Sequence, residues 1–170
     1  MLSKFTPKFL AIAFVSMLIS SCSNGADVEN MQVGAVPNAD FGKYSHNIRL
    51  VEAYNDTDWD RRVSDKNFRE ALANSLASNG LANYDYPAYE LSANIVQLTA
   101  PSNGFDVYVT SNVRYILRDT ANGDIVVDKS FESRQAVSVN DAKMIVKRKR
   151  MVDENTINDN IAQFINYLRR

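Results

Sequence analysis

Alternating hydrophobic and polar residues predict four β-strands in this chain. The first is Asn47–Tyr54, in which Ile48 and Leu50 share a face. Three later segments also alternate with a period of two, which is typical of strands that bury one face. These segments are Tyr89–Leu98, Phe105–Arg118 and Ile125–Val137.

The turn between the last two strands determines their register. A two-residue loop would place Asp128 opposite Leu117, with its carboxylate on the core face. A three-residue loop, Ala121–Gly123, with Gly123 in the left-handed conformation, keeps hydrophobic residues opposite one another. We therefore predict the three-residue loop, which pairs Leu117 with Val127 and Val113 with Phe131.

The clearest predicted helix spans Ser64–Asn79. Phe68, Leu72 and Leu76 recur on one stripe with helical spacing. Ser64 can cap the N-terminus of the helix, because its hydroxyl can accept a bond from an unpaired backbone amide. Gly80 can end the helix in the left-handed conformation, with Leu81 folding back onto it.

A second helix is predicted at the C-terminus, where Ile157, Ile161, Phe164, Ile165 and Leu168 form an apolar stripe. The residues from about Asp141 either continue this helix or form a separate piece. The elements follow the order β-α-β-β-β-α, and each element has one apolar face. This pattern predicts an α+β two-layer sandwich, in which a mostly antiparallel four-stranded sheet carries two helices on one face.

The beginning of the chain has the pattern of a secretory signal peptide. Lys4 and Lys8 form a short basic region before an apolar run, Phe9–Ile19. This run is too short to span a bilayer, which needs roughly 20 residues. Two small residues then precede Cys22, the only cysteine. This arrangement is similar to the lipobox of bacterial lipoproteins, in which the thiol receives diacylglycerol and the new N-terminus an acyl chain. More than one chain makes such anchoring stable.

The chain therefore divides into a signal peptide (1–21), a lipidated flexible tether (22–45) and a single α+β domain (46–170). The tether prediction rests on a polar stretch interrupted by glycine and proline, with a short strand expected at Met31–Val36. When extended, some 20 residues would reach about 60–70 Å. Ser23, rather than aspartate, follows the cysteine. By resemblance to Gram-negative lipoproteins, this implies an anchor in the outer membrane that faces the periplasm.

Charge and residue types narrow the possible functions. The formal net charge is −1 and becomes more negative once the signal peptide, which carries two lysines and no acidic residue, is removed. This balance argues against a nucleic-acid-binding protein. If Cys22 is acylated, no thiol remains for a disulfide or for catalysis. With His46 as the only histidine, we expect no metal site, no cofactor and no catalytic triad.

Two segments are candidate binding sites. The first is a loop rich in charge and holding the only tryptophan, a residue type that is common in binding hot spots. It comprises Asp58, Trp59, Asp60, Arg61 and Arg62. The alternative is that Trp59 covers the end of the core. Calcium is not expected there, because the glycine and glutamate of a calcium-binding loop are missing.

The second candidate is the densest positive patch in the chain. It comprises Lys143, Lys147, Arg148, Lys149 and Arg150. Such a patch can attract anionic lipid head groups or lipopolysaccharide phosphates. The alternative is an ordinary solvated helix face.

Four segments resemble a group of small, mostly uncharacterised bacterial outer-membrane lipoproteins: NFREALANSLASNGL, YELSANIVQL, GFDVYVTSNVRYILRDTANGDIVVDKSF and NTINDNIAQFINYL. The layout is also similar to that of the lipopolysaccharide-assembly lipoprotein. Neither resemblance brings catalytic residues. The lipobox, the tether, the compact α+β body and the missing catalytic set favour a non-enzymatic lipoprotein that serves as an interaction or assembly module for an envelope protein partner. The alternative is a lipid- or lipopolysaccharide-binding protein that uses a groove between helices and sheet.

Overall fold

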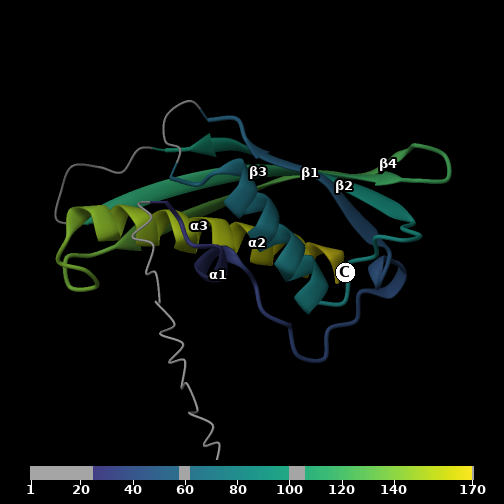
Figure 1. The fold of residues 1–170 in the computed structure, drawn as a ribbon, viewed down its shortest axis with the longest axis horizontal. Coiled ribbons are helices and arrows are strands. Elements are labelled where there is room, and N and C mark those ends of the chain that lie inside the picture. The colour runs from purple at the N-terminus through teal and green to yellow at the C-terminus, as the bar shows by residue number, and fades with distance from the viewer. Residues whose placement is uncertain (1–24, 58–61, 100–105, 170) are drawn as a thin grey trace, which may run out of the picture.

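The computed structural model describes residues 25–57, 62–99 and 106–169. These residues form two layers, with a sheet on one side and the helices on the other (Figure 1). The elements are α1 (Val28–Met31), the 3-10 turn η1 (Gly42–Tyr44), β1 (Ile48–Asn55), α2 (Asp65–Ser78), β2 (Tyr89–Leu98), β3 (Val107–Asp119), β4 (Ile125–Val137) and α3 (Ile145–Leu168). The predicted α+β sandwich is confirmed, with α1 and η1 preceding the predicted elements.

The sheet has the strand order β1-β2-β3-β4. β1 runs parallel to β2, and the other two pairings are antiparallel. A parallel pair needs a crossover connection, which α2 supplies here. The prediction of a mostly antiparallel sheet is therefore confirmed.

The register of the β3–β4 hairpin is confirmed, but its loop is longer than predicted. Leu117 pairs with Val127, and Gly123 has a φ of 80°. The backbone amide of Asp119 donates to the carbonyl of Asp124 at 2.8 Å, so four residues lie between this bonded pair. The side chains of Asp119 and Asn122 accept bonds from nearby loop amides, and such local bonds favour a wider turn. A register shift after Leu117 absorbs the difference.

The ends of α2 follow the predicted capping chemistry. The Ser64 hydroxyl accepts a hydrogen bond from the Asn67 amide at 3.1 Å. At the other end Gly80 has a φ of 64°, and the Leu81 amide donates to the Leu76 carbonyl at 2.9 Å. This pair of features is typical of a Schellman motif, in which the residue after the glycine packs back on the helix. Leu81 is accordingly buried.

α3 is one continuous helix from Ile145, whereas residues 141–144, where the sequence left the start of the helix open, form a turn before it. Its apolar stripe packs on the inner face of β3 and β4, where Tyr115 and Phe164 stack with their ring centroids 4.2 Å apart. The Tyr115 hydroxyl donates to the side-chain oxygen of buried Asn160. Asn160 in turn donates to the Phe131 carbonyl at 2.6 Å, so this side chain links the Tyr115 hydroxyl to the backbone of β4.

The prediction of a flexible tether over residues 22–45 is wrong for its described part, residues 25–45. Ala26, Met31 and Phe41 are buried in the core. The strand expected at Met31–Val36 does not form: the short helix α1 ends at Met31, and residues 32–36 are irregular. α1 packs against both α2 and α3. Two polar groups of α2 hold the segment that follows: the Ser75 hydroxyl accepts from the Val33 amide, and the Asn79 side chain accepts from the Val36 amide. The folded domain therefore extends upstream of residue 46.

Replacing Met31 by alanine tests whether α1 belongs to the core. Because the Met31 side chain is fully buried, Met31→Ala should lower the free energy of unfolding by about 2–5 kcal/mol. Urea denaturation followed by circular dichroism measures this loss. Glu29→Ala is the control on the exposed side of the same helix, and should change stability by less than about 0.5 kcal/mol. Equal stabilities of Met31→Ala and the wild type would contradict the structure.

Candidate functional site

The structure describes only part of the predicted binding loop. Outside the described residues lie four members of this loop, Asp58, Trp59, Asp60 and Arg61. The predicted lipidation site, Cys22, lies outside them as well. Arg62 is described, and its Nε donates to the Asp153 carboxylate at 2.5 Å. Its carbonyl accepts from the Ala26 amide at 2.7 Å. Arg62 thus binds the N-terminal segment and α3 to each other. The role of the loop in partner recognition stays a prediction.

The residues of the predicted basic patch fall into two sets: arginines that make internal contacts and lysines that are exposed to solvent. Arg148 is buried and donates to the carbonyls of Ala142 and Lys143 at 2.7 and 3.0 Å. Arg150 pairs with Asp27 and Glu154. Both arginines therefore serve internal contacts, which corrects the prediction of a five-residue surface patch. Lys143 and Lys147 are exposed, and Lys149 is partly exposed.

The buried carboxylate of Glu154 on α3 binds the N-terminal segment at Asp27 and Asn30. One of its oxygens accepts from the Asp27 amide at 2.8 Å, and the other accepts from the Asn30 side chain at 2.9 Å. The guanidinium of Arg150 lies 3.5 Å away. Burial raises the pKa of Glu154, and these bonds and Arg150 oppose the shift only in part. The neighbouring Asp153 is also buried, and its carboxylate forms an ion pair with Arg62.

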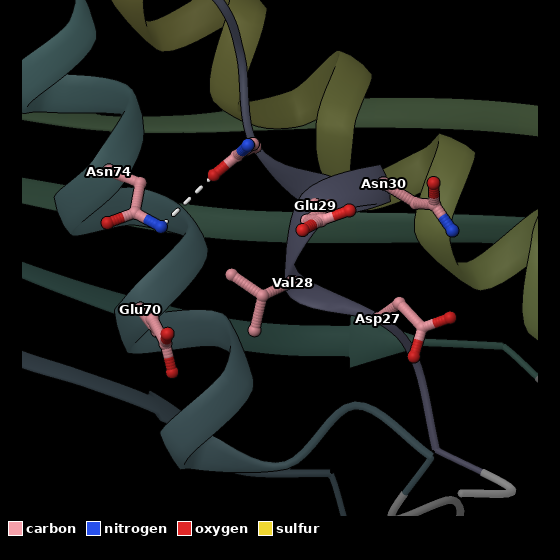
Figure 2. Close-up of a pocket in the computed structure, with 7 residues that line it drawn as sticks. Asp27, Val28, Glu29, Asn30, Glu70 and Asn74 are labelled. Atoms are coloured by element: carbon pink, nitrogen blue, oxygen red, sulfur yellow. Dashed lines mark hydrogen bonds between the residues drawn. The ribbon is translucent and has the colours of Figure 1, made fainter. Parts of the chain in front are cut away.

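A groove lies between α1 and α2 beside these contacts (Figure 2). Its volume is about 700 Å³, and it is lined by Asp27, Val28, Glu29, Asn30, Gln32, Glu70 and Asn74. Figure 2 shows Glu70 and Asn74 on α2 facing the α1 segment. The Asn74 amide donates across the groove to Gln32 at 3.0 Å.

The chemistry of the groove is acidic and polar. Three carboxylates lie around it, on Asp27, Glu29 and Glu70. Within the part of the chain that the structure describes, no group of three or more histidine, cysteine, aspartate or glutamate side chains is arranged to hold a metal ion. The groove offers acceptors for a polar or cationic group, but its lining contains no thiol, hydroxyl or imidazole nucleophile.

The space between the helices and the sheet, where a lipid was considered, is occupied by side chains of the protein. Met31 of α1 reaches into the core, and the inward residues of α2, α3 and the strands are buried with it. The described helices contain no segment that is both long enough and apolar enough to span a membrane. The lipid-binding alternative therefore gains no support from this region.

No protein-family model and no curated protein matches the chain, but solved structures share its fold. A Xanthomonas campestris protein of family DUF330 superposes with a TM-score of 0.60 at 9% identity, covering 81% of this chain and 91% of that one. A "putative lipoprotein" from Caulobacter crescentus gives 0.53 at 14% identity, covering 74% and 90%. The PelC dodecamer from Paraburkholderia phytofirmans gives 0.53 at 16%, covering 78% and 95%. This chain thus has a fold that occurs in a protein described as a lipoprotein.

None of these three structures carries the name of the lipopolysaccharide-assembly lipoprotein. That part of the resemblance is not supported by the structural comparison. The likeness to small bacterial lipoproteins is supported at the level of the fold.

The raised pKa of Glu154 predicts a distinctive pH dependence of stability. A glutamate whose pKa in the folded state lies above its unfolded value binds more protons when folded, so the stability it contributes falls as pH rises through the folded pKa. The wild type should therefore lose stability relative to Glu154→Gln as the pH rises above about 4.5, the ordinary value for glutamate.

Urea denaturation at a series of pH values measures this difference. Glu132→Gln is the matched control, since Glu132 is exposed on β4. Its difference from the wild type should vary much less over the same range. Parallel pH profiles of the wild type and Glu154→Gln would show that Glu154 is not perturbed by burial.

Proposed function

We propose that this protein is a lipoprotein anchored through acylated Cys22 in the outer membrane, facing the periplasm, where it acts as a non-enzymatic interaction or assembly module of an envelope complex. The observation that carries the proposal is that the lipobox-like cysteine stands directly before a domain whose fold occurs in a protein described as a lipoprotein. The fold likeness extends over most of the chain.

The side chains at the described groove suit the binding of a polar or cationic group. Nucleophilic catalysis by a thiol, hydroxyl or imidazole has no candidate in its lining. The groove between α1 and α2 offers carboxylates, amides and a valine. His46 lies in the turn before β1, away from the residues that line this groove.

The sheet face that is not covered by helices is the surface we assign to a protein partner (Figure 1). Tyr54, Val96 and Tyr108 are exposed there. A shallow depression of about 80 Å³ lies beside Tyr54 and Val96. Tyrosine and arginine are enriched where proteins bind one another, and Arg134 lies over the Tyr108 ring at 5.8 Å.

Two ion pairs cross the same face. Arg49 contacts Glu90 between β1 and β2, and Arg114 contacts Asp128 between β3 and β4. Both pairs are partly exposed to solvent, so they contribute little to stability, yet they place charges of both signs around the tyrosines. The PelC protein of the same fold is described as a dodecamer, which supports a role of this fold in assembly.

Cys22→Ala tests the anchor. The wild type should incorporate labelled fatty acid and fractionate with the outer membrane, because the acyl chains at Cys22 supply the stable attachment. The variant should lose the label and should no longer fractionate with the outer membrane. Ser23→Ala keeps the nucleophile and should retain the label. Unchanged labelling and fractionation of Cys22→Ala would reject the anchor.

A photo-crosslinking amino acid at Tyr54 tests the partner surface. Irradiated cells should yield a discrete adduct with a second protein, and the same residue placed at exposed Asn166 on α3 should not. Mass spectrometry distinguishes another envelope protein from a second copy of this chain. Adducts that are absent at Tyr54, or equally abundant at both positions, would remove this surface from the proposal.

A further inference from the structure

The chain enters the folded domain much closer to Cys22 than a tether of some 20 residues would allow. Ala26 is fully buried, and its amide is bonded to the Arg62 carbonyl. The next amide, of Asp27, is bonded to Glu154 of α3. Cys22 precedes Gly25 by three residues, a span of at most about 11 Å. If Cys22 is acylated, the body of the protein must lie against the membrane surface.

The point of entry identifies the part of the protein that is nearest to the anchor. Asp27 lies 3.7 Å from Arg150, which is close to the N-terminal end of α3. Arg150 lies five positions after Ile145, the first residue of α3, which corresponds to about 7.5 Å along the helix axis. That helix end and the turn before it form one end of the molecule (Figure 1).

This end exposes apolar side chains next to lysines. Met144 is 70% exposed, and Val139, Ile145 and Val146 are exposed as well. Lys143 and Lys147 are exposed among them. We call these six residues the α3 tip. From Ala142 to Val152 the chain carries no acidic residue. Exposed apolar residues mixed with lysines are typical of surfaces that insert into the head-group region of anionic membranes.

The α3 tip is held in shape by an internal contact. Buried Arg148 donates to the carbonyls of Ala142 and Lys143, which fixes the turn against the helix. The Asp141 carboxylate accepts from the Ser138 amide at 2.7 Å and closes the same turn. The apolar side chains are therefore presented by an ordered turn, and their exposure is not the result of a frayed helix end.

We propose that the α3 tip rests in the head-group region of the membrane that holds the Cys22 anchor, so that the domain stands end-on against the bilayer. The lysines meet lipid phosphates, and Met144, Ile145 and Val146 enter the adjoining apolar layer. This inference rests on the proposed lipidation of Cys22 and adds to it a second, non-covalent contact.

Fluorescence quenching in vesicles tests this orientation. Acylation of Cys22 leaves the chain without a free thiol, so one engineered cysteine can be labelled selectively. Ile145→Cys places a bimane label on the α3 tip. Ile125→Cys is the matched control, because it replaces the same residue type, 50% exposed against 41% for Ile145, at the opposite end of the molecule. The full lipidated protein is reconstituted into vesicles of phosphatidylethanolamine and phosphatidylglycerol.

Nitroxide lipids labelled near the head group should quench position 145 severalfold more strongly than position 125, and aqueous iodide should show the reverse preference. Equal lipid quenching at both positions in vesicle-bound protein would overturn the end-on contact while leaving the anchor intact. Position 145 shielded from both quenchers would indicate a contact between copies and would also overturn it. Protein that fails to co-float with the vesicles would reject the anchor and this inference together.

Discussion

The structure depends on two adjacent buried carboxylates of α3. The Asp153 carboxylate accepts a hydrogen bond from the Arg62 guanidinium. The Glu154 carboxylate accepts hydrogen bonds from the backbone amide of Asp27 and from the side-chain amide of Asn30. A buried carboxylate is costly unless charges and hydrogen-bond donors compensate it, and removing one partner leaves an uncompensated charge. α3 therefore requires the N-terminal segment, and the two ends of the described chain are joined in one structural unit.

The position of α1 follows from this requirement. Once Asp27 and Asn30 are held by Glu154, Met31 is carried into the space between α2 and α3, which otherwise contact each other little. The Ser75 hydroxyl then binds the Val33 amide at 2.8 Å. Apolar burial and polar pairing thus act on the same short segment, and neither would order so few residues alone, because an isolated helix of four residues is unstable in water.

The elements that could be predicted from the sequence are those set by local chemistry. Periodicity located the four strands, Ser64 and Gly80 marked the ends of α2, and opposed hydrophobic residues gave the hairpin register. That residues 25–45 are folded could not be predicted in this way, because the side chains that bind this segment lie far along the chain. Asp27 and Glu154, for example, are 127 positions apart. One signal was present. Ser75 and Glu154 lie on or near apolar helical stripes, where a polar group needs a partner from elsewhere. The interaction surfaces had no comparable signal. Two of the five residues of the basic patch, Arg148 and Arg150, were misassigned, because the sequence does not show which cations find internal partners.

The proposed end-on orientation determines how the uncovered sheet face would be presented to a protein partner. β4 leads directly into the turn at the α3 tip, so a domain with this end on the bilayer directs its strands toward the membrane. The uncovered sheet face then points sideways, along the membrane surface. Two proteins tethered to one membrane meet at a raised effective concentration, so a modest polar face is sufficient for them to associate. The exposed ion pairs and tyrosines of this sheet suit such a lateral contact better than an obligate interface, which would bury a larger and more apolar surface.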